Sequence, residues 1–489
     1  MEYLAIDLGA GSGRAIVGII ENGKIRLNEV FRFNNKQIKL GNTLYWDFLD
    51  LFDNIKQGIY SAQKKGYNLQ GIAVDTWGVD FGLLDKKGNL ISNPVCYRDS
   101  RTDGMTEIVS SFVSKEELYK QTGIQQLNIN SIYQLFSLKE NNEPALQILD
   151  KVLFIPDLIN YFLTGKMVNE YTIATTSQLL NAETKQWDEK LFNQLSFSPN
   201  WMSEIQPPCT VIGNLKKEIA NELETPNIKV YAVGSHDTAS AIGAIPLDEE
   251  TAFLSSGTWS LLGTTIEKPI LTEEARMNDF TNEGGIDDKI LFMRNITGLW
   301  LLQQVISEWK KEDNEPYDYD YLLAECAKAK AFQSIVNSDA PDFNHPVSMR
   351  KAIQDYCRKT EQKIPETKGE LVRCILESLA LKYYAVIKKL KVCTQKDIKK
   401  LFIVGGGSQN NVLNQFIANA LNMEVIIGIT EATAIGNIVQ QAIANNQISN
   451  LAEGHRLIEN SFSFTFFQPE IGNEWTEEKK EQYANTLLL

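Results

Sequence analysis

A pattern of strand, small-residue turn and strand occurs twice in this chain. In the first copy, an apolar run at residues 3–7 is followed by the turn GAGSG at residues 9–13 and a second apolar run at residues 14–20. In the second copy, the turn SSGT at residues 255–258 joins two apolar runs in a hairpin-like pattern. Turns of this kind leave backbone N–H groups open to an anion. The repeat predicts an internally duplicated α/β chain with two phosphate-binding turns facing each other across a cleft.

Two further turns contain candidate functional residues. The turn GSHDT at residues 234–238 ends a strand-like run and opens an alanine-rich helix, which predicts an ionised Asp237 at a positive helix N-terminus. A carboxylate in this setting could be a base or merely a helix cap. The glycine cluster at residues 405–407 follows a buried-strand run and precedes a helical pattern, as in a nucleotide pocket that the backbone approaches closely.

Composition excludes several classes of function. The 489 residues predict two or three domains, and a net charge of −14 argues against nucleic acid or an anionic membrane as the main partner. No apolar run approaches the length of a membrane helix. The six cysteines have no metal-like spacing, and the acidic N-terminus does not resemble a signal peptide, which together predict a cytoplasmic protein. The motifs of P-loop NTPases, dinucleotide enzymes, zinc sites and serine hydrolases are missing from the sequence.

An ordered set of motifs resembles the FGGY family of carbohydrate kinases over nearly the whole chain. The motifs are DLGAGSGR, DTWGVDFGLLD, YRDSRT, GSHDTASA, SSGTWSLLG and GGGSQN. The resemblance implies a two-domain actin-like ATPase fold (ribonuclease H-like), with duplicated α/β domains around a central cleft. It divides the chain near Pro246 into a sugar-binding N-terminal domain, residues 1–245, and a nucleotide-binding C-terminal domain, residues 246–489. The departure is Gly11, where the family usually has Ser.

The resemblance also implies an activity. The expected reaction is ATP-dependent phosphorylation of the 1-hydroxyl of L-rhamnulose, which gives L-rhamnulose 1-phosphate and ADP. The alternatives are a kinase for another ketose such as L-fuculose, or a non-catalytic sugar sensor or chaperone-like ATPase of the same fold. The partners would be a small ketose and ATP with Mg²⁺, and the oligomeric state is not predicted.

Site residues follow from the motifs and the resemblance together. Asp237 is the predicted base, because a hydroxyl that attacks phosphorus needs a carboxylate to accept its proton. Asp7 is predicted to hold Mg²⁺, directly or through water. The predicted substrate-binding residues are Gly78, His236, Asp237, Thr238 and Asn295. The predicted ATP-binding residues are Ala10, Gly11, Ser12, Gly13, Arg14, Thr258, Gln303 and Gly406.

Several of these residues have plain structural interpretations. Asn295 could cap a helix expected at residues 298–309, Gln303 could lie on a solvated helix face, and His236 could be a hydrogen-bonded structural residue. The acidic stretch 310–319 is predicted to be a loop. The related kinases imply a possible cysteine pair at Cys357 and Cys374, but two free thiols are favoured in a cytosolic chain.

Overall fold

The computed structural model describes residues 1–313, 318–344, 346–472, 474–484 and 487. The chain forms two compact units. The first contains residues 1–246, 265–292 and 431–463, and the second contains residues 247–264, 293–430 and 464–489. The predicted domain boundary follows residue 245, and the chain first passes from the first unit to the second after residue 246. Two later segments of the chain belong to the first unit again. In the described part of the chain, no helix is long and apolar enough to cross a membrane.

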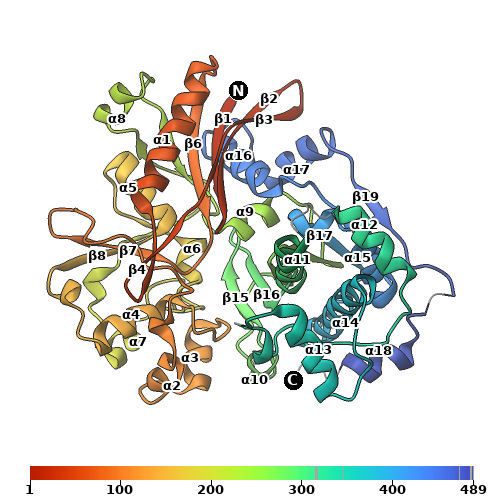
Figure 1. Ribbon diagram of the computed structural model, residues 1–489. Coiled ribbons are helices and arrows are strands. Elements are labelled where there is room, and N and C mark those ends of the chain that lie inside the picture. Colours follow the sequence, from red (N-terminus) through yellow and green to blue (C-terminus); the bar gives the residue numbers. More distant parts are fainter. Residues whose placement is uncertain (314–317, 345, 473, 485–486, 488–489) are drawn as a thin grey trace. The chain divides into compact units, whose positions relative to one another are not determined.

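The first unit is built on a six-stranded mixed sheet. Its order is β11 (Thr210–Asn214), β12 (Lys229–Ala232), β6 (Leu69–Thr76), β1 (Glu2–Leu8), β2 (Ser12–Glu21) and β3 (Lys24–Asn34). β1 and β2 form the predicted antiparallel hairpin, and β3 extends it to an antiparallel meander, seen at the red end of the colour scale in Figure 1. β1 and β6 are parallel, with Asp7 directly opposite Asp75. The predicted hairpin at the start of the chain is therefore confirmed.

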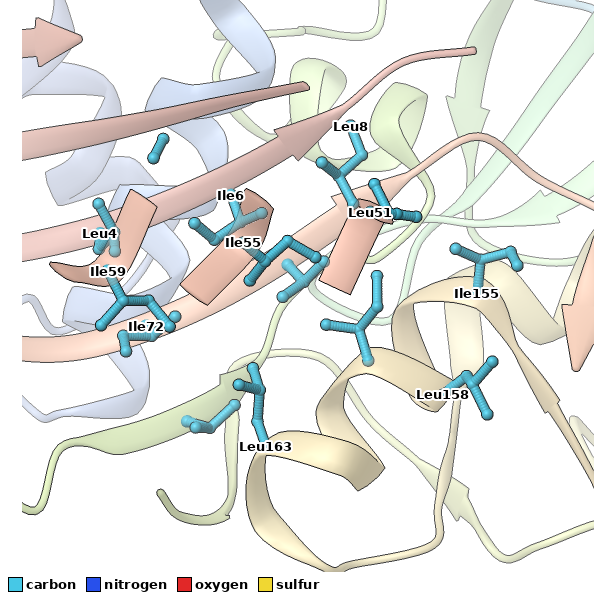
Figure 2. Close-up of a cluster of buried hydrophobic side chains, with 14 of the residues drawn as sticks. Leu4, Ile6, Leu8, Leu51, Ile55, Ile59, Ile72, Ile155, Leu158 and Leu163 are labelled. Carbon is cyan, nitrogen blue, oxygen red and sulfur yellow. The ribbon is translucent and has the colours of Figure 1, made fainter. Parts of the chain in front are cut away.

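One face of this sheet forms the hydrophobic core of the first unit. Successive side chains of a strand point to opposite faces, so Leu4, Ile6 and Leu8 of β1 lie on the same face. They pack with Leu51, Ile55 and Ile59 of α1 (Phe48–Lys64), which recur every four residues along one side of the helix, and with α5 (Ile155–Thr164) (Figure 2).

The opposite face of β1 and β6 carries polar groups. α16 (Ala432–Ala444) contacts both strands and also α9 (Asp237–Gly243). Its Asn437 donates to Asp75 Oδ2 over 2.6 Å, and Gln441 donates to the backbone oxygen of Leu4. α16 therefore explains why residues 431–463 belong to the first unit: this helix covers a sheet face that would otherwise expose buried polar groups.

The sheet of the second unit repeats this plan. Six neighbouring strands have the order β16 (Ile290–Thr297), β14 (Trp259–Ile266), β13 (Thr251–Ser256), β17 (Lys400–Val404), β18 (Glu424–Ile427) and β19 (Thr465–Phe467). β13 and β14 form an antiparallel hairpin, β13, β17 and β18 are parallel, and β19 is antiparallel to β18. β1, β2, β6, β12 and β11 of the first unit have the same directions in the same order. The predicted duplication is confirmed.

The other elements are connections and insertions. In the first unit they are β4 (Gln37–Leu40), β5 (Thr43–Trp46), β7 (Phe81–Asp85), β8 (Leu149–Phe154), β9 (Asn169–Glu170), β10 (Ile205–Gln206), β15 (Thr281–Gly284), α2 (Met105–Ser110), α3 (Lys115–Thr122), α4 (Ser131–Glu140), α6 (Tyr171–Thr175), α7 (Glu189–Leu195), α8 (Lys217–Glu222), α10 (Glu273–Met277) and α17 (Leu451–Glu459). In the second unit they are α11 (Trp300–Asp313), α12 (Tyr319–Lys328), α13 (Met349–Lys359), α14 (Lys368–Thr394), α15 (Asn411–Leu421) and α18 (Glu477–Ala484).

One local prediction changes. The acidic stretch 310–319 is not one loop, since α11 continues to Asp313 and α12 begins at Tyr319; residues 314–317 lie outside the described residues. The charged side chains of Lys310, Lys311 and Glu312 do not interrupt α11, because Lys and Glu are tolerated on the solvated side of a helix. Cys357 and Cys374 are free thiols, as favoured from the sequence, and lie in hydrogen-bond contact.

Candidate functional site

The turn before α9 is held by hydrogen bonds to its backbone N–H groups. Three successive residues donate: Gly234 to Gln440 Oε1 at 2.6 Å, Ser235 to Glu170 Oε2 at 3.1 Å and His236 to Thr172 Oγ1 at 3.2 Å. The acceptors come from α16 and from the start of α6, so elements distant in sequence fix the conformation of the turn. A buried turn whose donors are all satisfied presents the next side chain, that of Asp237, in a defined place.

Asp237 is the first residue of α9. Its Oδ1 accepts a hydrogen bond from the Thr238 hydroxyl at 3.1 Å and lies 3.6 Å from His236 Nε2. Burial raises the pKa of Asp237 above its ordinary value, against the lowering effects of His236 and Thr238. This differs from the expectation of a carboxylate governed by the helix N-terminus, because desolvation outweighs the local dipole. A raised pKa suits a group that accepts a proton.

Two more carboxylates lie near Asp237. Asp7 and Asp75 are buried on the same sheet face, and both interact electrostatically with Asp237. Burial raises the pKa of Asp7, and burial together with the charge of Asp7 raises the pKa of Asp75 well above its usual range. Arg14 forms ion pairs with Asp7 and with Glu431. Arg14, which was predicted to bind ATP, is therefore paired with two carboxylates of the first unit.

The acidic pair has the chemistry of a magnesium site. Asp75 Oδ1 is buried and has no hydrogen-bond partner among the described residues. Carboxylate oxygens are hard ligands of the kind Mg²⁺ prefers, and this ion is usually bound by one or two carboxylates together with phosphates and water. The described residues hold no group of three or more His, Cys, Asp or Glu that could bind a metal by themselves. The pair thus fits a cation that a phosphate ligand brings with it.

The corresponding edge of the second unit carries no such charges. The pairing registers align Asp7 with Ser255 and Asp75 with Val404, because these residues occupy the same places in the two repeats. Arg14 likewise corresponds to Leu261. The two halves share a backbone plan but differ in chemistry, with carboxylates in the first and neutral turns in the second.

The second unit brings some of the predicted ATP residues together. Thr258 Oγ1 donates to Gln303 Oε1 of α11 over 3.0 Å. Gly406 begins a short 3₁₀ turn after β17, and a Cβ atom added there would meet nothing within 4 Å. Neighbouring Gly405 has φ of +86°, and its Cβ would lie 2.6 Å from the backbone oxygen of Ser256. Gly405 therefore shapes the turn, whereas Gly406 leaves open space for a ligand.

Asn295 does not cap a helix. It lies in β16, and α11 begins five residues later at Trp300. The structural interpretation offered by the sequence is therefore wrong for Asn295, because the strand continues to Thr297.

The segment around Gly78 is rigidly held. Asp80 Oδ2 accepts hydrogen bonds from Trp46 Nε1 at 2.6 Å and Trp77 Nε1 at 3.0 Å, and burial raises the pKa of Asp80 to about 6. Val79 has φ of +67°, which is unusual for a β-branched residue and marks local strain. A Cβ atom on Gly78 would lie 3.2 Å from Thr176, so a side chain there would require a small shift of Thr176.

The turn at residues 9–13 is partly strand. Ser12, Gly13 and Arg14 belong to β2, and the Gly9 N–H closes the turn onto the Ser12 oxygen at 2.9 Å. Ala10 and Gly11 form its tip, and nothing lies within 4 Å of a Cβ added at Gly11. Anion binding by these residues stays a prediction.

Sequence reasoning missed four residues of the site: Asp75, which lies opposite Asp7, and Glu170, Glu283 and Gln440, which contact the turn. Asp75 opens the quoted motif DTWGVD, so the motif itself pointed to it. Glu170, Glu283 and Gln440 stand in no motif. Only the folding of distant segments brings them to residues 234–237.

Two family models match the chain almost from end to end. The N-terminal domain model of the FGGY family of carbohydrate kinases matches residues 2–243, and the C-terminal domain model matches residues 252–445. The chain belongs to this family. It is therefore a carbohydrate kinase, and the resemblance carried by the six motifs is confirmed.

Several proteins with similar sequences are rhamnulokinases. This FGGY kinase is 44% identical to the rhamnulokinase of Oceanobacillus iheyensis, covering 94% of this chain and 96% of that protein. It is 42% identical to the rhamnulokinase of Bacteroides thetaiotaomicron, covering 97% of each, and 39% identical to that of Bacillus subtilis, covering 96% of each.

Solved structures confirm the fold of this FGGY kinase. A ligand-bound xylulose kinase from Lactobacillus acidophilus has a TM-score of 0.80 at 18% identity, covering 100% of this chain and 96% of that one. Plasmodium falciparum glycerol kinase with ADP has a TM-score of 0.77 at 18% identity, covering 99% and 96%. The predicted two-domain actin-like α/β fold is thus shared with sugar kinases of distant sequence.

Proposed function

We propose that this FGGY kinase transfers a phosphoryl group from ATP to the 1-hydroxyl of L-rhamnulose, giving L-rhamnulose 1-phosphate and ADP. The observation that carries the proposal is the partly exposed Asp237, held at the start of α9 beside the buried His236 and Thr238. The names of the similar proteins, at about 40% identity over nearly the full length, support L-rhamnulose as the substrate.

Asp237 accepts the proton of the attacking hydroxyl in this proposal. Its raised pKa makes it a stronger base than a fully solvated aspartate. The neighbouring side chains, His236 and Thr238, and the backbone at Gly78 bind hydroxyls of the sugar. Asn295 of the second unit is proposed to contact a further sugar hydroxyl.

The residues proposed to contact ATP are Thr258, Gln303, Gly406 and residues 10–14. Mg²⁺, when bound, neutralises charge on the phosphates. Asp7, with Asp75 behind it, would hold the ion directly or through water. We also propose a cytoplasmic location, because the six free thiols suit a reducing compartment that supplies ATP.

An ADP-release assay over a panel of sugars tests this function. L-Rhamnulose, L-fuculose, D-xylulose and glycerol are each supplied with ATP and Mg²⁺, and the enzyme is compared with Asp237→Asn. We expect the largest kcat/KM for L-rhamnulose and little ADP release without sugar. A larger kcat/KM for another ketose would show that this ketose, and not L-rhamnulose, is the preferred substrate. Sugar-independent ADP release that survives Asp237→Asn would instead favour a chaperone-like ATPase, and no turnover with any sugar would favour a sensor.

A further inference from the structure

His236 lies between two carboxylates from different elements of the first unit. Its Nε2 is 3.6 Å from Asp237 Oδ1, and its Nδ1 is 3.3 Å from Glu283 Oε2 in β15. Both His236 and Glu283 are buried. Neither His236 Nδ1 nor Glu283 Oε2 has a hydrogen-bond partner among the described residues. The two buried atoms face each other at ion-pair distance, so a proton on Nδ1 is the group that would compensate the burial of both.

The position of Glu283 is fixed from its own strand. The Thr281 hydroxyl donates to Glu283 Oε1 at 3.3 Å, which leaves Oε2 directed at the imidazole. The backbone of the next residue, Gly284, is anchored by a hydrogen bond to Thr175 Oγ1 at 2.8 Å. On the other side, the His236 N–H is held by Thr172. Backbone and side-chain contacts thus hold the imidazole of His236 and the carboxylate of Glu283 facing each other.

We propose that Glu283 is a positioning residue that keeps a proton on Nδ1 of His236 and holds the imidazole in its cationic form. This inference rests on the proposed role of Asp237 and extends it. A cationic His236 stabilises the negative charge of Asp237 and so opposes its repulsion by the nearby Asp7 and Asp75. Nε2 of His236 is then a donor for a sugar hydroxyl or for Asp237.

The surrounding charges agree with this assignment. Burial by itself lowers the pKa of an imidazole, but Glu283, Asp237 and Glu170 together raise the pKa of His236 above its ordinary value of 6.5. Desolvation has the largest effect on the pKa of Asp237 and raises it. Of the two charged neighbours, the imidazole of His236 lowers this pKa, and the smaller effect of Glu283 raises it. Removing the charge of Glu283 therefore lets His236 lose its proton, and the pKa of Asp237 rises.

The chain offers a clean test, because it has only three histidines: His236, His345 and His455. Histidine labelled with ¹³C at Cε1 gives three signals in the intact enzyme, assigned with His345→Asn and His455→Asn. We expect His236 to titrate above pH 6.5 in the parent and at a lower pH in Glu283→Gln, where only Asp237 and Glu170 still oppose the effect of burial. Glu283→Asp, which keeps the charge, should retain a value between the two.

Two controls accompany this titration. Glu274→Gln makes the same chemical change at an exposed site on α10 of the same unit, and should leave His236 unchanged. His455 is an internal control, since its Nε2 faces the Gly243 oxygen and burial lowers its pKa. It should titrate below 6.5 in parent and variant alike. A parent His236 that titrates below 6.5 overturns the proposal even when Glu283→Gln does not fold, as does a His236 value that Glu283→Gln leaves unchanged.

The pH profile separates positioning from a structural role. The acidic limb of kcat/KM should move to higher pH in Glu283→Gln, with a loss of about 10-fold or more below neutral pH that recovers in alkaline buffer. An equal loss at every pH would mean that Glu283 only supports the fold, and would overturn the proposal. The histidine titration needs no turnover, so a failure of the proposed sugar kinase activity would not be mistaken for a failure of this inference.

Discussion

At the scale of the residue, the chemistry of this kinase rests on the surroundings of the partly exposed Asp237 side chain. The sequence singled out this carboxylate through the motif GSHDT, and the structure adds why it is basic: desolvation and, to a smaller extent, the charge of Glu283 raise its pKa. The supports of the turn, Glu170 and Gln440, are 65 and 206 residues away from the groups they hold. No local pattern in the sequence could reveal those contacts.

Asp237→Asn tests the base directly. The amide keeps the size and the hydrogen bond from Thr238 but cannot accept the hydroxyl proton, so kcat should fall by about 10² to 10⁴ with the fold intact. Asp320→Asn is the matched control, because Asp320 is exposed in the first turn of α12. Steady-state kinetics and circular dichroism measure both variants. A kcat within a few-fold of the parent would remove Asp237 from the reaction.

At the scale of the element, the glycine turn after β17 and the cap of α14 show which local signals have structural consequences. The sequence predicted the strand, the turn at residues 405–407 and the following helix correctly. It could not tell the glycines apart, because the difference depends on what surrounds each one. Gly405 has a positive φ and touches β13, whereas Gly406 faces open space.

Gly406→Ala should therefore affect the ligand and spare the fold. The new methyl group meets nothing within 4 Å, so the melting temperature should not change. If the nucleotide lies against this backbone, KM for ATP should rise by about 10-fold while KM for the ketose stays constant. Gly405→Ala is the contrasting variant and should lower the melting temperature. Unchanged ATP kinetics in Gly406→Ala would place the nucleotide elsewhere.

α14 begins with a capping box whose contribution depends on pH. Thr367 Oγ1 accepts the Glu370 N–H, and Glu370 Oε2 accepts the N–H groups of Thr367 and Glu366. Hydrogen bonds from Lys363 and these N–H groups lower the pKa of Glu370 to about 2. Because this value lies below the ordinary 4.5, the ionised group stabilises the fold above about pH 4.5, and the effect is lost as the pH falls towards 2.

Glu370→Gln should lower the free energy of unfolding by about 1 kcal/mol at pH 7 and by less at pH 3. Urea denaturation at the two pH values measures the difference. Glu478→Gln, in the first turn of α18 and exposed, serves as the control and should show a smaller effect. A difference that grows towards pH 3 would contradict the assigned direction of the pKa.

At the scale of the whole molecule, the two units share a backbone plan but differ in the charge of their turns. The chain as a whole is strongly negative. The net charge of −14 repels nucleotide phosphates at long range. Raising the ionic strength from about 10 mM to about 150 mM shortens the Debye length from about 30 Å to about 8 Å. This repulsion is thereby screened.

We therefore expect kcat/KM for ATP to rise a few-fold over this range of salt, with kcat/KM for the ketose unchanged. The uncharged sugar is the internal control, because it does not respond to the field of the protein. Stopped-flow or steady-state measurements in KCl at constant free Mg²⁺ give both values. A fall in kcat/KM for ATP would show that a local positive field governs the encounter.

The sequence by itself determined the repeated hairpins, the glycine turns, the family and the identity of Asp237 as the candidate base. Strand alternation, turn-forming residues and ordered motifs are local properties, so they can be read along the chain. Only the tertiary structure decided that α16 returns to cover the first sheet, that Asp7 lies opposite Asp75, and that Glu283 faces His236. These contacts depend on packing between distant segments, and the pKa shifts of the site follow from the burial that this packing creates.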